Sequence, residues 1–164
     1  WHGACAAWEQ ILLEHPRDLY ALQWAHLFDF YRGDARNLRG RVARVLPEWP
    51  TDDALRPYLL GMHAFGLEET GDYARAEAAG RRGVDLEPTD GWSQHAVAHV
   101  LEMQNRTAEG IAWMRGSFCQ WRAARRTRLS GSGRGFAVCL RRRPGTTSPV
   151  ARRSAITTPR ASSG

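Results

Sequence analysis

The sequence predicts an all-α protein, an α-solenoid of stacked helix-turn-helix repeats that ends in a disordered, arginine-rich C-terminal tail. Three observations predict this fold class: short motifs that recur at a fixed spacing, apolar residues at helical intervals, and a change of composition after Met114. With 164 residues, 43% of them hydrophobic, the chain is long enough for about one domain with a packed core.

Several series of landmarks share one period. The motif Pro-x-Asp occurs at 16–18, 50–52 and 88–90, and the turn residues Gly33, Gly71 and Asn105 follow the same rhythm, with steps of 34 and 38 residues. Thirty-four residues is the period of the tetratricopeptide repeat, a helix-turn-helix unit, and the longer step indicates a four-residue insertion. The alternative is a set of amphipathic helical hairpins whose spacing agrees by coincidence.

The period divides the chain into helix pairs. Gly33 and Gly71 can adopt the positive φ that ends a first helix, and Asn105 tolerates it. Asp34 and Asp72 then follow as N-caps of the second helices. The predicted units are the second helix of a truncated repeat (1–16), a repeat (19–52), the repeat that matches best (57–90), an incomplete repeat (91–118) and a disordered basic tail (119–164).

Two strings are longer than a generic repeat demands: GMHAFGLEE at 61–69 and HAVAHVLEMQ at 95–104. Together with Asp90-Gly91-Trp92 and Gly110-Ile111-Ala112-Trp113, they resemble the tetratricopeptide repeat protein 38 family, over about Ala4 to Met114. The resemblance implies a soluble, all-helical repeat protein without a well-established biochemical activity. It also implies that six polar residues belong to the family pattern, namely His63, Glu68, Glu69, His95, His99 and Glu102.

A helical array leaves its first helices lining a concave surface, so we expect a groove there that is aromatic along one rim and acidic further in. Such a surface suits a protein or peptide partner, and a basic peptide is the better electrostatic match. The alternative is that some of these aromatic side chains pack on the adjacent repeat. The predicted groove residues are Tyr20, Gln23, Tyr58, Phe65, Glu68, Glu69, Trp92, His95, His99 and Glu102.

His95 and His99 are four residues apart, a spacing that places both imidazoles on one helical face. With Glu102 and a carboxylate from Glu68 or Glu69 they form an alternative metal set, although two histidines at this spacing are more often hydrogen-bonded in or near a polar groove. No Ser–His–Asp order, phosphate loop or nucleotide fingerprint is present, so we expect a non-enzymatic binding module without a cofactor.

The net charge of +6 combines two unlike segments. Residues 1–114 hold all 17 acidic residues and 11 arginines, whereas residues 115–164 hold 12 arginines and no acid. We expect the second segment to be disordered and to leave an exposed apolar patch around Trp113. Two interpretations of it stay open: a genuine tail that binds nucleic acid or anionic lipid without sequence preference, or an out-of-frame translation of a GC-rich gene.

No apolar run reaches the ~18 residues of a membrane-spanning helix, and no charged-then-apolar leader precedes the repeats. The three cysteines are widely spaced and form no CxxC motif, which favours a reducing compartment and therefore a cytoplasmic protein without a membrane partner. Because the chain begins at Trp1, we expect a fragment or a processed product.

Overall fold

The computed structural model describes residues 2–130, with side chains described for residues 3–126. This part of the chain is all-helical and contains no strand, as the sequence predicts. Residues 131–164, which hold most of the predicted tail, lie outside the described residues. The helices are α1 (His2–Glu14), α2 (Leu19–Tyr31), α3 (Ala35–Val45), the short 3-10 helix η1 (Leu46–Glu48), α4 (Arg56–Glu68), α5 (Tyr73–Leu86), α6 (Gly91–Met103) and α7 (Thr107–Ser130).

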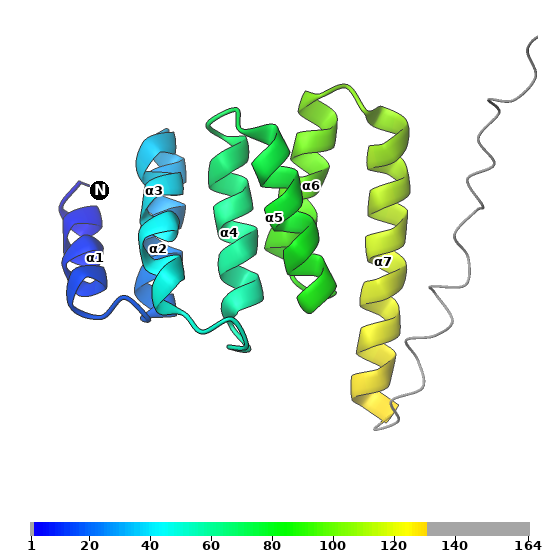
Figure 1. Ribbon diagram of the computed structural model, residues 1–164, viewed down its shortest axis with the longest axis horizontal. Helices are drawn as coiled ribbons and strands as arrows, with labels where there is room; N and C mark the ends of the chain where they lie inside the picture. The colour runs from blue at the N-terminus through cyan, green and yellow to red at the C-terminus, as the bar shows by residue number, and fades with distance from the viewer. Residues whose placement is uncertain (1, 131–164) are drawn as a thin grey trace, which may run out of the picture.

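The helices stand side by side in chain order, from α1 at one end to α7 at the other (Figure 1). Each helix packs against the next one along the chain, and α4 also packs against α6. In the view of Figure 1, α3 and α5 lie in front of α2 and α6, so the first and second helices of the hairpins form two layers. α7 extends past the ends of the other helices.

The turns within the hairpins follow from their sequence. Gly33, Gly71 and Asn105 have φ angles of 68°, 78° and 56°, which confirms the positive φ predicted at all three positions. The side chains of Asp34 and Asp72 each accept a hydrogen bond from the backbone N–H three residues further on, so both act as N-caps as predicted. These local signals set where the first helix of a hairpin ends and the second begins.

The core runs along the array as a chain of contacting clusters. One cluster joins α1 to α4 through side chains such as Leu12, Leu22, Val42 and Met62. The other two clusters bring in α5 and α6, and they contain Leu38, Ala64, Phe65 and Ala96 in one case and Leu67, Ala76 and Val100 in the other. Burial of these side chains supplies the favourable free energy that holds neighbouring hairpins together.

The prediction that the last helix ends by residue 118 and that disorder follows is wrong for residues 119–130, because α7 continues to Ser130. Arg122 stands where the repeat pattern has the proline that stops a second helix, and the first proline beyond α7 is Pro144. Alanine and arginine, which are common in this stretch, are good helix formers.

Among the described residues, no helix is both long enough and apolar enough to cross a membrane.

Candidate functional site

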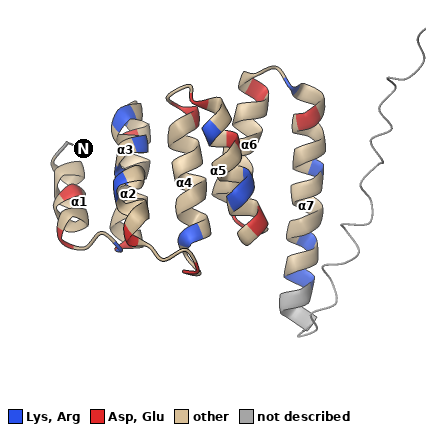
Figure 2. Ribbon diagram, viewed as in Figure 1, with Lys and Arg blue, Asp and Glu red and all other residues tan. Residues whose placement is uncertain are grey.

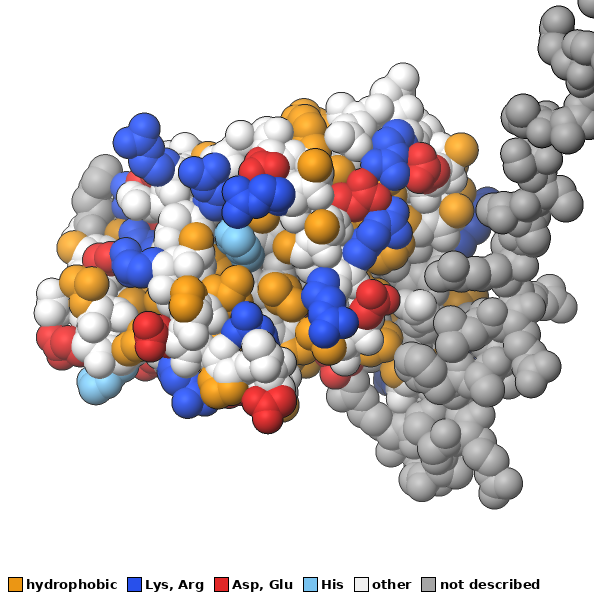
Figure 3. All heavy atoms as spheres, viewed as in Figure 1, with side chains coloured by type: hydrophobic (Ala, Val, Ile, Leu, Met, Phe, Trp, Pro, Cys, Tyr) orange, Lys and Arg blue, Asp and Glu red, His pale blue; other side chains and the backbone are white. Residues whose placement is uncertain are grey.

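The two layers of helices differ in charge. α2 and α6 contain no arginine or lysine, whereas α3 has four arginines and α5 has three. Figure 3 shows the face on which α3 and α5 lie in front, and basic side chains gather there around a histidine. The layer of first helices instead carries most of the aromatic, acidic and histidine side chains of the predicted groove.

Phe65 on α4 is the centre of a ring cluster. Its ring centroid lies 5.6 Å from that of Trp92 and 5.5 Å and 5.9 Å from those of His95 and His99. Phe30 from α2 completes the cluster at 5.4 Å. Phe65 itself is only 2% exposed, so it positions the surrounding rings instead of offering its own surface to a partner.

The three α6 members of the ring cluster occupy one helical face, at spacings of three and four residues. The His95 and His99 ring centroids are 4.2 Å apart, as expected for two imidazoles one turn apart. Burial lowers the pKa of His95, and the neighbouring His99 lowers it further. His95 is therefore held neutral at physiological pH and can accept a hydrogen bond or bind a cation.

Glu68, the last residue of α4, places a buried carboxylate beside the ring cluster. The residue is only 6% exposed, and its Oε2 atom makes no hydrogen bond to any described residue. The Nδ1 atom of His99 lies 3.7 Å from it, which is too long for a hydrogen bond. Burial raises the pKa of Glu68, the nearby His99 opposes that rise, and Glu69 and Glu102 add to it.

Three residues bring ligand atoms together as a metal site requires. One atom each from Glu68, Glu69 and His99 lie within 4.8 Å of one another. This set contains His99 of the predicted metal set and the two alternative carboxylates, but neither His95 nor Glu102. His95 nevertheless adjoins His99, and Glu102, an exposed residue, lies near enough to raise the pKa of Glu68.

The remaining predicted groove residues lie apart from this cluster or are only partly exposed. Tyr20 is 68% exposed and contacts Trp8 and Trp24, with ring centroids 6.3 Å and 6.1 Å away. Gln23 on α2 and Tyr58, two turns before Phe65 on α4, are half-buried. The predicted groove thus divides into two parts. One is the ring cluster with its carboxylates, and the other is a separate group of aromatic side chains around Tyr20 on α1 and α2.

His63, which the family resemblance groups with Glu68 and Glu69, lies near Arg39, Arg75 and Asp72. Burial and the two arginines lower its pKa, so this α4 side chain lies beside the basic second helices α3 and α5.

The exposed apolar patch expected around Trp113 is present in its neighbours on α7, namely Ile111, Met114 and Phe118, but the Trp113 ring itself packs back onto the molecule. Its Nε1 donates a hydrogen bond to the carbonyl of Gln94 at 3.0 Å, and the guanidinium of Arg81 lies 4.9 Å from the ring centroid.

Sequence reasoning missed His26, which is fully buried on α2 and has its ring 6.0 Å from Phe65 and 5.4 Å from Trp92. The available signal was its position, because His26 stands where the repeat pattern has a small residue.

A shallow hollow of about 610 Å³ lies elsewhere, lined by residues 14–19 at the turn between α1 and α2. The lining of that hollow includes Glu14, His15, Arg17 and Asp18, and none of the predicted site residues.

Comparison with known proteins leaves the site without an assigned role. No protein-family model matches the chain, and no solved structure matches it.

Proposed function

We propose that this protein is a cytoplasmic, tetratricopeptide-like α-solenoid that acts as a non-enzymatic scaffold, as its resemblance to the tetratricopeptide repeat protein 38 family implies. The 34-residue period, the paired helices and the positive φ at Gly33, Gly71 and Asn105 support the repeat assignment. The layer of first helices is the binding surface, and its partner is a protein or peptide segment that presents a basic side chain.

The observation that carries this proposal is the buried carboxylate of Glu68, whose Oε2 has no hydrogen-bond partner among the described residues. A buried polar atom without a partner costs free energy, and an incoming guanidinium or ammonium group would satisfy it. Glu69 supplies a second carboxylate beside it, and the rings of Trp92 and His95 lie on the same face of α6 as His99, which adjoins Glu68. Aromatic faces next to carboxylates bind cationic side chains through cation–π and charge-assisted contacts.

Peptide pools test the proposal. One pool has Arg at a fixed central position among random residues, and the matched pool has Gln there; binding of each is measured by fluorescence anisotropy. Wild-type protein is expected to bind the Arg pool about tenfold more tightly. The Glu68→Gln/Glu69→Gln variant loses that preference, whereas Glu48→Gln, an exposed acid on η1, keeps it. Equal binding of the two pools by wild-type protein would overturn the proposal.

The ligand geometry of Glu68, Glu69 and His99 favours a second candidate, a divalent-metal site. One imidazole and two carboxylates form a donor set that zinc accepts, and His95 stands close enough to His99 to add a fourth ligand. Such a site would engage the same carboxylates as a basic side chain, so the two ligands would compete.

Calorimetric titration with Zn²⁺ separates the candidates. A metal site predicts stoichiometric binding that His99→Gln abolishes and that His63→Gln, beside Arg39 and Arg75, leaves intact. Addition of Zn²⁺ would then displace the Arg peptides. Absence of Zn²⁺ binding, or equal binding by the His99→Gln variant, would rule out the metal candidate and leave the peptide proposal standing.

A further inference from the structure

α7 presents an apolar stripe that nothing in the described structure covers. Ile111, Met114, Phe118 and Trp121 recur at intervals of three and four residues, the spacing of a helix seam that packs against another helix. Each of these side chains is between 39% and 58% exposed. We call these four residues the α7 face.

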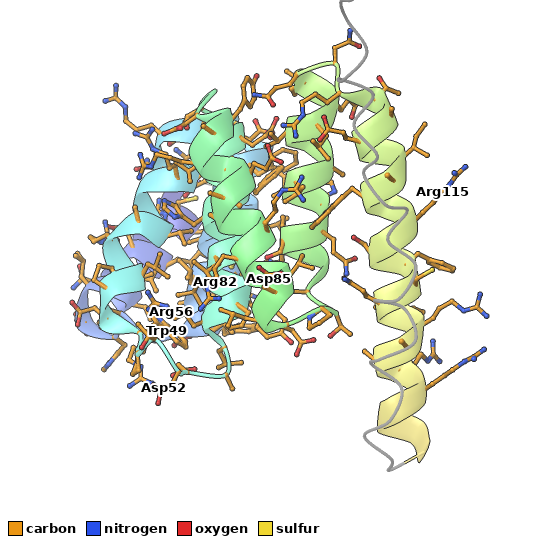
Figure 4. The ribbon with its side chains drawn as sticks, turned by 45° about the vertical axis from the view of Figure 1, so that its right-hand side comes forward. Trp49, Asp52, Arg56, Arg82, Asp85 and Arg115 are labelled. Atoms are coloured by element: carbon orange, nitrogen blue, oxygen red, sulfur yellow. The ribbon has the colours of Figure 1, made fainter. Side chains whose placement is uncertain are left out.

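The α7 face is bordered by positive charge. Between residue 110 and its end, α7 contains five arginines and no acidic residue, and Figure 2 shows positive charge along its lower part. Arg115 points away from the rest of the molecule (Figure 4). The guanidinium groups of Arg122 and Arg125 lie over the rings of Phe118 and Trp121. A surface that packs on the α7 face therefore needs two kinds of side chain: apolar ones to cover the stripe and acidic ones to pair with the arginines.

At the other end of the array, α1 and α2 present an aromatic ladder made of Trp8, Tyr20, Trp24 and Phe28. Successive ring centroids are 6.3 Å, 6.1 Å and 6.1 Å apart. Tyr20 and Trp24 are both exposed. α1 and α2 contain no arginine or lysine. Of their acids, Asp29 is fully buried and Glu9 is paired with arginines of α3, whereas Glu14 is exposed.

We propose that the α7 face of one copy packs on the aromatic ladder of a second copy, so that the chains associate head to tail. The α7 face is bordered by arginines, the ladder lies on two helices without arginine or lysine, and both surfaces expose aromatic side chains, so one contact covers both exposed faces. Pairing of α7 with α7 would instead set arginines against arginines. A head-to-tail contact uses two different surfaces, so each copy keeps one face open for the next and the assembly grows as an open chain. This inference is independent of the ring cluster's ligand.

Sedimentation velocity of the full chain, from low to high micromolar concentration, tests the proposal with two complementary variants. Phe118→Glu/Trp121→Glu blocks the α7 face, and Tyr20→Glu/Trp24→Glu blocks the ladder. Wild-type protein is expected to shift from monomer to species larger than dimer, and added salt to weaken this association. Each variant alone stays monomeric, and an equimolar mixture of the two forms dimers and nothing larger.

Leu13→Glu/Met103→Glu is the matched control, because it places two charges at equally exposed apolar positions outside both faces, and it should assemble like wild type. Circular dichroism checks that each variant is folded, and the milder Phe118→Ser/Trp121→Ser and Tyr20→Ser/Trp24→Ser pairs replace any variant that is not. A wild-type monomer at every concentration would overturn the proposal. So would self-association of either folded variant, or a monomeric mixture.

Discussion

Gly66 on α4 lies where its helix touches the backbone of α3. A methyl group at this position would stand 2.7 Å from the Cα atom and 2.9 Å from the backbone nitrogen of Arg39. Because backbone atoms cannot move aside without displacing the helix, Gly66→Ala is expected to lower the free energy of unfolding by about 1–3 kcal/mol. Urea unfolding followed by circular dichroism measures the change.

Gly40, inside α3, is the matched control for this substitution. A methyl group there would meet no heavy atom within 4 Å, so Gly40→Ala should gain the usual helical advantage of alanine, about 0.5–1 kcal/mol. Opposite signs for the two substitutions would show that close contact of α3 with α4, and not helix propensity, decides the residue at position 66. Equal effects would contradict the contact.

His26 makes stability depend on pH. Burial lowers the pKa of His26 from 6.5 to about 4, and the backbone of Leu38 offsets only part of that shift. Between these two pH values the unfolded chain binds a proton that the folded protein does not, so stability is lost on acidification through this window. The loss is expected to reach about 3 kcal/mol by pH 4.

Comparison of wild-type protein with His26→Leu isolates this effect. Burial raises the pKa of Asp29 to about 6, which makes stability fall as pH rises between 3.8 and 6 and so opposes the effect of His26. Asp29 is present in both proteins, so the difference between their unfolding free energies reports His26 alone. A difference that stays constant from pH 7 to pH 4 would show that the imidazole is not buried.

Residue identity predicted part of the site and missed part of it. The positive-φ positions follow from local chemistry, so Gly33, Gly71 and Asn105 could be found by spacing alone. Phe65 belongs to the expected groove positions, yet it is buried because α2 and α6 close over it. Its burial depends on how closely neighbouring hairpins pack, and the position of a residue within the repeat does not determine that distance.

At the scale of helices, a buried ion network fastens α1, α2 and α3 together. The Arg41 guanidinium on α3 donates two hydrogen bonds to Asp29 on α2, at 2.7 Å and 3.2 Å, and also contacts Glu9 on α1. Arg41 is nearly buried and Asp29 fully so. Arg41→Ala would leave the Asp29 carboxylate buried without its partner and is expected to cost about 3–5 kcal/mol of unfolding free energy.

Arg44→Ala is the control for this network. Arg44 lies 2.7 Å from the other carboxylate oxygen of Glu9, but its side chain is 45% exposed. Loss of an exposed ion pair costs under about 1 kcal/mol. Urea unfolding of both variants should therefore separate them clearly. A similar cost for the two substitutions would mean that burial of the network is not what makes it stabilising.

α7 shows why an element can be missed when composition alone is considered. The arginines, serines and distant prolines of residues 115–164 predict disorder when they are averaged together. The apolar series from Ile111 to Trp121 nevertheless continues at helical spacing across the predicted boundary, and no proline interrupts residues 107–130. The helix follows its local pattern, and the average over a longer window conceals it.

Over the whole molecule, the packing is unequal along the array. α4, α5 and α6 all contact one another, whereas the principal helix contact of α1 is with α2 and that of α7 is with α6. The stability of such an array is carried by contacts between neighbours, so its ends open more readily than its middle. Native-state hydrogen exchange is therefore expected to be slowest in α4 and fastest in α1 and in the part of α7 that extends past α6. Uniform exchange along α1 to α7 would instead indicate a single cooperative unit. Protection of α7 that rises with protein concentration would be the sign that a second copy covers it.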